Sequence, residues 1–280
     1  MKKLILFSNA KVNIGLKIIN ERSDGYHNIQ TLFQEIDFSD QITFCVRDKG
    51  WTLSIDDPRI PNDDSNTCIQ AYKAFKSQFP DIGGIALKLR KSIPSGAGLG
   101  GGSSNAATVL KGLNSLYKLD LGRKILEKLA IKIGADVPFF IKGGAQVGKG
   151  LGEKLTPARL IEGYYLLVIP QIAINTKEAY SQIKKGLNLS KHKHKFAGSL
   201  KEFKDSFTFI QNDFEQVIIP AYPEIGRIKK TLSKLGAKFS SLSGSGSTVF
   251  GIFDEEADAC SAQSYFQTQY KAILSTPVQS

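Results

Sequence analysis

A glycine-rich loop in the first half of the chain reads Pro94-Ser95-Gly96-Ala97-Gly98-Leu99-Gly100-Gly101-Gly102-Ser103-Ser104. Before it, Ile85, Leu87 and Leu89 alternate with Lys88 and Arg90, as in a half-buried strand. After it, apolar residues recur at helical spacing from Ala106 to Tyr117, and Ser103, Ser104 and Asn105 are residue types that favour a helix N-cap. A strand, a glycine loop and a helix start in this order predict a loop whose backbone N–H groups hold phosphate.

Length and composition describe an ordinary globular protein. The chain has 280 residues, of which 41% are hydrophobic and 22% charged, so disordered and collagen-like classes are excluded. We place a domain boundary just before the apolar run 164–169, which gives domains 1–160 and 161–280.

The charge balance is strongly basic, with 37 basic against 26 acidic residues and a net charge of +11. Seven lysines and one acid lie between Lys184 and Lys204. This bias favours anionic ligands in general, and it leaves two interpretations of the lysine-rich segment open: a solvated excursion or an RNA-binding module. His192 and His194 in the same segment lack further metal ligands nearby in sequence.

Targeting signals and disulfide patterns are missing from the sequence. Cys45, Cys68 and Cys260 are far apart and form no C-x-x-C pair, and the apolar run 4–7 is too short for a signal peptide. No stretch is long and apolar enough to span a membrane. We therefore expect a cytoplasmic protein that binds no membrane.

Other elements follow from periodicity and turn residues. Asp24-Gly25 predicts a turn, Pro138 is expected to end or restart a helix, and the glycine-dense strip from Gly143 is interpreted as a turn. The remaining apolar patterns predict strands at 4–7, 12–19, 32–38, 164–169 and 249–253, and helices at 68–75, 126–133, after 175–176 and at 223–235.

Three familiar nucleotide signatures do not fit. Gly96-x-Gly98-x-x-Gly101 matches the dinucleotide fingerprint, but Asp120 lies at the foot of the next helix instead of ending a strand. The Walker-like Gly143-x-x-x-x-Gly148-Lys149 is followed by Gly150, so the metal-binding hydroxyl is missing. Asp213-Phe214-Glu215 is a near miss to the protein-kinase D-F-G, and no H-R-D accompanies it.

The pattern P-x-x-x-G-L-G-G-G-S-S opening a helix resembles the phosphate loop of the GHMP kinases, a family of small-molecule kinases. The resemblance extends along most of the chain through the segments Ala10–Asn13, Asp24–His27, Gly134–Phe140, Gly150–Glu153 and Leu242–Ser247. It implies an α+β fold of two domains: an N-terminal nucleotide domain with a left-handed βαβ unit and a C-terminal ferredoxin-like domain. It also implies ATP as phosphate donor, Mg²⁺ as cofactor and a small-molecule alcohol as acceptor.

The resemblance assigns the catalytic roles to Lys11 and Asp136. Asp136 would orient or deprotonate the acceptor hydroxyl, and Lys11 would keep Asp136 ionised and stabilise charge on the transferred phosphate. From the residues alone, Asp136 could be a helix N-cap and Lys11 a solvated strand lysine. Whether Asp136 acts as a full base or only orients the hydroxyl stays open, as do the Mg²⁺ ligands.

The resemblance also assigns the binding sites. All residues of the loop 94–104 would bind ATP, and Asn66 would approach the adenine, although an N-cap is the alternative for Asn66. The motifs resemble a branch of the family whose acceptor carries a cytidine diphosphate group and serves isoprenoid precursor synthesis. The residues implied for that acceptor are Asn13, Tyr26, His27, Thr176 and Tyr180.

Two alternatives to this acceptor remain. A surface turn would explain Tyr26-His27 without any ligand. A kinase of homoserine, mevalonate or a sugar would keep the fold but would not need an aromatic platform for a base. The second glycine–serine loop, 243–247, is expected beside the first by resemblance, and taken alone it could be a flexible connection.

Overall fold

A computed structural model of the chain describes residues 3–186, 207 and 210–279. The chain divides into two compact units. Unit 1 comprises the residues up to Ala10, Phe38–Ser95 and Gly100–Gly143, and unit 2 comprises Lys11–Asp37, Gly96–Leu99 and the residues from Gly144 onward. The predicted domain boundary at 160 stays a prediction. Residues 187–204 of the lysine-rich segment, with His192 and His194, lie outside the described residues.

Two long strands, β1 (Lys3–Glu21) and β2 (His27–Arg47), run through both units. They pair with each other, and the turn between them has the positive φ of +81° at Gly25 that Asp24-Gly25 predicts. The strand pieces expected at 4–7 and 12–19 are therefore one continuous strand.

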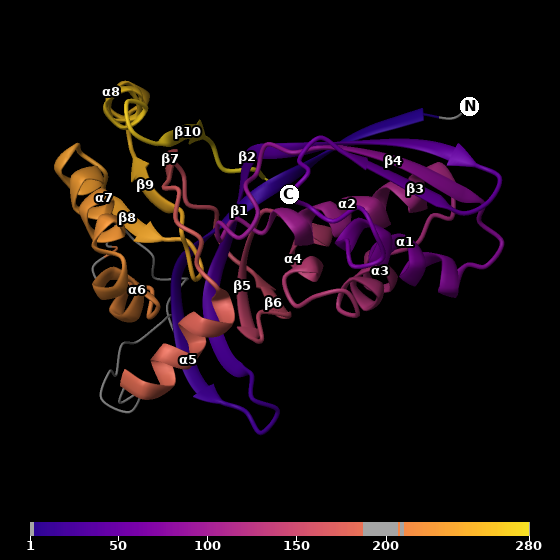
Figure 1. The fold of residues 1–280 in the computed structure, drawn as a ribbon, viewed down its shortest axis with the longest axis horizontal. Helices are drawn as coiled ribbons and strands as arrows, with labels where there is room; N and C mark the ends of the chain where they lie inside the picture. The colour runs from indigo at the N-terminus through magenta and orange to yellow at the C-terminus, as the bar shows by residue number, and fades with distance from the viewer. Residues whose placement is uncertain (1–2, 187–206, 208–209, 280) are drawn as a thin grey trace. The chain divides into compact units, whose positions relative to one another are not determined.

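Unit 1 is built from a sheet and helices, with α1 following β3 and with α2, α3 and α4 following β4 (Figure 1). Its β4 runs antiparallel to residues 41–47 of β2 and parallel to β3, and α1 links β3 to β4 in a βαβ crossover. The left hand of this crossover stays a prediction. The other elements of unit 1 are β3 (Trp51–Ile55), α1 (Thr67–Gln78), β4 (Gly84–Arg90), α2 (Gly101–Leu116), α3 (Arg123–Ala130) and α4 (Val137–Lys142).

Helix α2, which follows the glycine loop, lies close to β2 because Gly112 has no side chain. A Cβ on Gly112 would lie 2.5 Å from the ring of Phe44, which is completely buried. Only glycine permits this approach. Because α2 also packs against α1 and α4, its N-terminus is fixed by buried contacts.

Unit 2 carries a four-stranded antiparallel sheet in the order β10-β7-β9-β8. The helices α7 and α8 both pack on it, α7 on β8 and β9 and α8 on β7 and β10. The β-α-β-β-α-β order confirms the expected ferredoxin-like topology (Figure 1). The elements of unit 2 are β5 (Ala145–Gly150), β6 (Lys154–Pro157), β7 (Tyr164–Ile169), α5 (Thr176–Gly186), α6 (Glu215–Ala221), α7 (Pro223–Lys234), β8 (Phe239–Leu242), β9 (Val249–Phe253), α8 (Glu256–Phe266) and β10 (Lys271–Ser275).

One element predicted from sequence is wrong. The strip from Gly143, interpreted as a turn, contains β5, which pairs antiparallel with residues 29–34 of β2. Glycines hid the strand pattern here. A Cβ on Gly148 would lie 2.5 Å from the ring of Phe33, so the glycine allows a close approach instead of marking a turn.

Candidate functional site

The glycine loop joins β4 to α2 through glycines with positive φ, +69° at Gly96, +77° at Gly98 and +70° at Gly100. The helix begins at Gly101, and Gly100 occupies the N-cap position without a side-chain hydrogen bond. The expected N-cap role of Ser103, Ser104 and Asn105 is therefore wrong, because these residues lie inside the first turns. No side chain caps the N-terminus of α2, as a phosphate-binding helix start requires.

The part of the loop in unit 2, Gly96–Leu99, is held between β1 and the second glycine–serine loop. Leu99 accepts a hydrogen bond from the backbone of Lys11 at 3.0 Å, and Gly98 accepts one from the Ser243 hydroxyl at 2.9 Å. A Cβ on Gly98 would lie 2.0 Å from the Ser243 carbonyl oxygen, so glycine is required there. The second loop is thus an ordered partner of the first, as the resemblance implies, and not a flexible connection.

Lys11 is a buried cation on β1. Its side chain is only 4% exposed, its ammonium donates to Asn13 Oδ1, and the ammonium lies 5.3 Å from the centre of the Phe33 ring. Asn13 is 2% exposed and donates to the Thr31 hydroxyl at 2.9 Å. This burial excludes the alternative of a solvated strand lysine. The contacts with Asn13 and Phe33 compensate for the cost of burying the charge.

Asp136 lies in unit 1 at the start of α4, in a half-buried position followed by buried Val137 and Pro138. It occupies the N-cap position, but its side chain makes no capping hydrogen bond. The structural alternative for this carboxylate, helix capping, is therefore not realised. Its convergence with Lys11 of unit 2 stays a prediction.

Of the residues expected at the acceptor, Asn13 lies on β1, and the other four lie at the β1–β2 turn and on α5. Tyr26 is 64% exposed, whereas His27 is 5% exposed and stacks on Tyr180 with ring centroids 4.9 Å apart. A hydrogen bond from Arg22, followed by one from the Tyr26 N–H, lowers the pKa of Asp24 and orders this turn. The structure thus brings His27 and Tyr180 together and leaves a face of Tyr26 accessible.

Thr176 begins α5, and its hydroxyl lies 2.8 Å from the Ser245 hydroxyl in the second loop. Asn66 caps α1: its Oδ1 accepts from Cys68 N at 2.9 Å, and its Nδ2 donates to the Pro61 carbonyl at 2.7 Å. The capping alternative for Asn66 is realised, and an approach to adenine stays a prediction.

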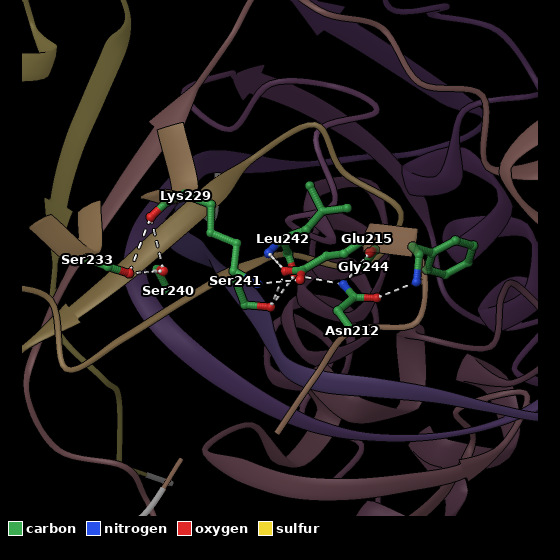
Figure 2. Close-up of polar contacts among 9 residues, drawn as sticks. Asn212, Glu215, Lys229, Ser233, Ser240, Ser241, Leu242 and Gly244 are labelled. Atoms are coloured by element: carbon green, nitrogen blue, oxygen red, sulfur yellow. Dashed lines mark hydrogen bonds and ion pairs between the residues drawn. The ribbon is translucent and has the colours of Figure 1, made fainter. Parts of the chain in front are cut away.

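Sequence reasoning missed a set of polar contacts that hold the second loop. Figure 2 shows Asn212 donating to the carbonyl oxygens of Leu242 at 2.8 Å and Gly244 at 2.7 Å, and Glu215 accepting from Leu242 N at 2.9 Å. In the sequence, the signal for these contacts is the motif Asp213-Phe214-Glu215, a near miss to the protein-kinase D-F-G.

A second missed group is the buried carboxylate of Asp40 in unit 1. It accepts hydrogen bonds from Ser92 N at 2.8 Å, Ile93 N at 2.9 Å and the Asn105 amide at 2.9 Å, and it pairs with Lys91. These contacts tie the segment entering the glycine loop to the helix leaving it.

Metal-ligand clusters and cysteine pairs are not found among the residues that the structure describes. Across residues 3–186, 207 and 210–279, no three His, Cys, Asp or Glu side chains are grouped to hold a metal ion, and none of the helices found there has the length and apolar character of a membrane span. The three cysteines are unpaired, and burial raises the pKa of Cys68 to about 12. Cys68 is therefore a structural thiol.

Comparison with known proteins extends this picture to the whole chain. Family models described as the GHMP kinases N terminal domain and GHMP kinases C terminal match residues 66–144 and 188–272. A 4-diphosphocytidyl-2-C-methyl-D-erythritol kinase from Pelodictyon phaeoclathratiforme is 39% identical over 99% of this chain and 98% of its own. The kinase of the same name from Geobacter sulfurreducens is 37% identical over 98% of this chain and all of its own.

Solved structures agree. The crystal structure of a 4-(cytidine 5'-diphospho)-2C-methyl-D-erythritol kinase aligns with a TM-score of 0.83 at 29% identity, over 99% of this chain and 100% of that one. A homoserine kinase from Cytophaga hutchinsonii shares the fold, with a TM-score of 0.78 at 21% identity over 99% of this chain and 95% of its own. The chain therefore belongs to the GHMP kinase family, within it to the family of 4-diphosphocytidyl-2-C-methyl-D-erythritol kinases.

Proposed function

We propose that the protein transfers the γ-phosphoryl group of ATP to the 2-hydroxyl of 4-diphosphocytidyl-2-C-methyl-D-erythritol, giving ADP and the 2-phosphate ester. This reaction serves isoprenoid precursor synthesis. The observation that carries the proposal is the 39% identity with a kinase of this name over nearly the full length of both chains. Phosphoryl transfer needs a phosphate cradle, positive charge and a group that orients the acceptor hydroxyl, and the chain offers residues for each.

The phosphate side is the glycine loop with the N-terminus of α2. Gly96, Gly98 and Gly100 have the positive φ that lets a loop backbone approach a ligand closely, and the uncapped helix start adds the positive end of its dipole. We assign the triphosphate to residues 94–104 and the adenine to the neighbourhood of Asn66.

Mg²⁺ fits this kind of site without a protein cage. It is usually held by substrate phosphates and one or two protein oxygens. The candidates are the Ser103 and Ser104 hydroxyls and the Asp136 carboxylate. When bound, Mg²⁺ would neutralise charge on the phosphates.

Lys11 and Asp136 complete the catalytic pair. Lys11 is held rigid by Asn13 and Phe33, so its ammonium is preorganised to stabilise charge that develops during transfer. Asp136 does not cap its helix, and we assign it to the acceptor hydroxyl, as base or as orienting group.

The acceptor's cytosine is assigned to Tyr26 and His27. A base sandwiched between two rings needs about 7 Å between them, twice a contact of ~3.5 Å. His27 and Tyr180 lie 4.9 Å apart, so no base fits between these two. The accessible ring of Tyr26 would therefore stack on the base, while His27, positioned by Tyr180, would hydrogen-bond its polar edge, with Asn13 and Thr176 lining the rest of the pocket.

The test is an ADP-release assay on the purified protein with a panel of alcohols. The proposal expects turnover with the cytidine diphosphate-linked methylerythritol and none with free methylerythritol, homoserine or mevalonate. Turnover of homoserine or mevalonate at a comparable kcat/KM would overturn it in favour of another acceptor on the same fold.

A further inference from the structure

The segment Asn212–Glu215 lies between β1 and the second glycine–serine loop of unit 2, immediately before and at the start of α6. None of its four residues was assigned a role from sequence. Asn212 and Glu215 contact the backbone around Ser243, Asp213 contacts β1, and Phe214 contacts Tyr180 of α5.

Asn212 contacts the second loop directly. It is 1% exposed, and its amide group is fully used: Nδ2 donates to the Leu242 and Gly244 carbonyl oxygens, and Oδ1 accepts from Phe214 N at 3.0 Å. The two carbonyls flank Ser243, so Asn212 fixes the backbone on both sides of that residue.

Glu215 fixes the same backbone from the strand side. Its Oε1 accepts from Leu242 N at 2.9 Å and from the Ser241 hydroxyl at 3.0 Å, and its Oε2 pairs with Lys229 of α7 (Figure 2). The end of β8 is therefore bound by a carboxylate whose own position is set by a neighbouring helix.

Ser243, held in this way, joins the two sides of the site. Its hydroxyl donates to the Gly98 carbonyl in the glycine loop at 2.9 Å and accepts from the backbone N–H of Asn13 at 3.2 Å. A displacement of Ser243 would move the phosphate loop relative to the strand that carries Lys11 and Asn13.

Asp213 and Phe214 extend the contacts to the strand and the aromatic wall. Asp213 Oδ2 accepts from Ile18 N at 2.7 Å, and its backbone N–H donates to Leu16 at 2.8 Å. Phe214 packs edge-on against Tyr180, with centroids 4.9 Å apart, and Tyr180 stacks on His27.

We propose that Asn212–Glu215 is a positioning segment that sets the register between the glycine loop and the acceptor residues. Asn212 and Glu215 would control the alignment of donor and acceptor through Ser243, and Phe214 would control acceptor affinity through Tyr180 and His27. The kinetic part of the test rests on the proposed function, because it needs turnover of the proposed acceptor. The hydrogen-exchange part rests on the contacts alone.

The experiment compares Asn212→Ala and Phe214→Leu with wild type and with Ser240→Ala. Ser240 is a matched control: it is buried in the same β8 strand and bonds Ser233 and Lys229 at the far end of the cluster in Figure 2. Steady-state kinetics with both substrates are combined with hydrogen exchange of the amides of residues 243–248 and with thermal unfolding.

Asn212→Ala is expected to lower kcat about 100-fold, because misplacement of reacting groups by about 1 Å has that effect, and to speed exchange in residues 243–248. Phe214→Leu is expected to raise the acceptor KM about tenfold, with the ATP KM unchanged, a split that general destabilisation cannot produce. Ser240→Ala should match wild type in both readouts.

A folded Asn212→Ala protein with wild-type kcat and exchange would overturn the proposal, as would an equal rise of both KM values in Phe214→Leu. If wild type does not turn over the cytidine diphosphate-linked acceptor, the proposed function fails instead. The exchange measurement then still decides whether Asn212 holds the second loop.

Discussion

Lys11 carries its charge inside unit 2, whereas its residue type taken alone also allowed a solvated strand lysine. A lysine between Ala10 and Val12 in an apolar strand either reaches solvent or finds partners, and here Asn13 and Phe33 supply them. An ammonium held in this way is expected to act on charge in the transition state.

The proposed pairing of Lys11 with Asp136 can be tested by a double-mutant cycle. Lys11→Met and Asp136→Asn are each expected to lower kcat by about 10²- to 10³-fold, the usual cost of removing one electrostatic contact from an active site. If the two groups act as a unit, the double variant should lose little more than either single variant. The measurement is ADP release at saturating substrates, with ATP binding followed by calorimetry.

Lys88→Met is the control for that cycle, because Lys88 is an exposed strand lysine on β4 and should leave kcat unchanged. Losses that multiply in the double variant would show that Lys11 and Asp136 work independently.

Tyr26 is the residue that we propose separates this acceptor from those of other GHMP kinases. Because its ring is 64% exposed and adjoins buried His27, Tyr26→Ala should weaken acceptor binding about tenfold, in line with the ~1–3 kcal/mol of base–aromatic stacking, and leave ATP binding unchanged. Calorimetric titration of cytidine diphosphate and of ATP measures both. An equal loss for the two ligands would contradict the cytidine pocket.

At the scale of elements, the glycine loop depends on the segments at its two ends. Asp40 is completely buried, and Lys91 is 7% exposed in its side chain. Their ion pair, with the hydrogen bonds to Ser92, Ile93 and Asn105, links β4's exit to α2 and so fixes the distance that the loop must span.

Asp40→Asn should destabilise the protein by about 3–5 kcal/mol, because Lys91 would be left buried without a counter-charge. Urea unfolding followed by circular dichroism and fluorescence measures the change. We also expect a higher ATP KM in the folded variant, since the loop loses its anchor.

Asp57→Asn is the matched control for Asp40→Asn, being an Asp-to-Asn change in the same unit. Its partner Arg59 is 86% exposed in its side chain, so the urea midpoint should stay near that of wild type. Equal shifts of the urea midpoint in the two variants would mean that the buried ion pair of Asp40 and Lys91 stabilises the fold no more than the exposed pair does.

At the scale of the whole molecule, the C-terminal strand is tied to β2 by Asp37. Its carboxylate accepts from Ser275 Oγ at 2.5 Å, Thr276 N at 2.9 Å and Thr276 Oγ1 at 2.8 Å. Burial alone would raise the pKa of Asp37, but these hydrogen bonds outweigh it and lower the pKa below 3.8.

This lowered pKa predicts acid-sensitive folding. Ionised Asp37 stabilises the folded state fully above its unfolded pKa of about 3.9, and the contribution is lost as pH falls through the lower folded pKa. The difference in free energy of unfolding between wild type and Asp37→Asn should therefore be largest above about pH 5 and shrink towards pH 2. Exposed Asp81→Asn serves as control, and a difference that grows on acidification would contradict the assignment.

The net charge of +11 is also a property of the whole molecule, and it suits two polyanionic substrates. We expect no specific nucleic-acid binding, so filter binding of a generic RNA should disappear by about 200 mM salt. Deletion of residues 187–204 should leave turnover intact, whereas salt-resistant RNA binding would revive the RNA-binding alternative.

Local sequence patterns predicted most of the helices and strands. Apolar periodicity predicted β4, β7, β9, α2 and α7 within a few residues, because each buries one face or a continuous run against the core. The prediction of a turn failed at Gly148, where the glycine allows close packing against Phe33 within a strand. The N-cap prediction failed at the start of α2, where Gly100, with a positive φ, occupies the N-cap position instead of a serine.

The sequence by itself determined the strand–glycine loop–helix unit, the family and the fold, because these depend on contiguous residues with fixed backbone preferences. Only the tertiary structure decided that Lys11 is buried, that Asn66 caps a helix, that His27 stacks on Tyr180 and that Asn212 and Glu215 hold the second loop. Those facts depend on contacts between residues far apart in the chain, such as Asn13 and Ser243, and a hydrogen bond across 230 positions leaves no local pattern in the sequence.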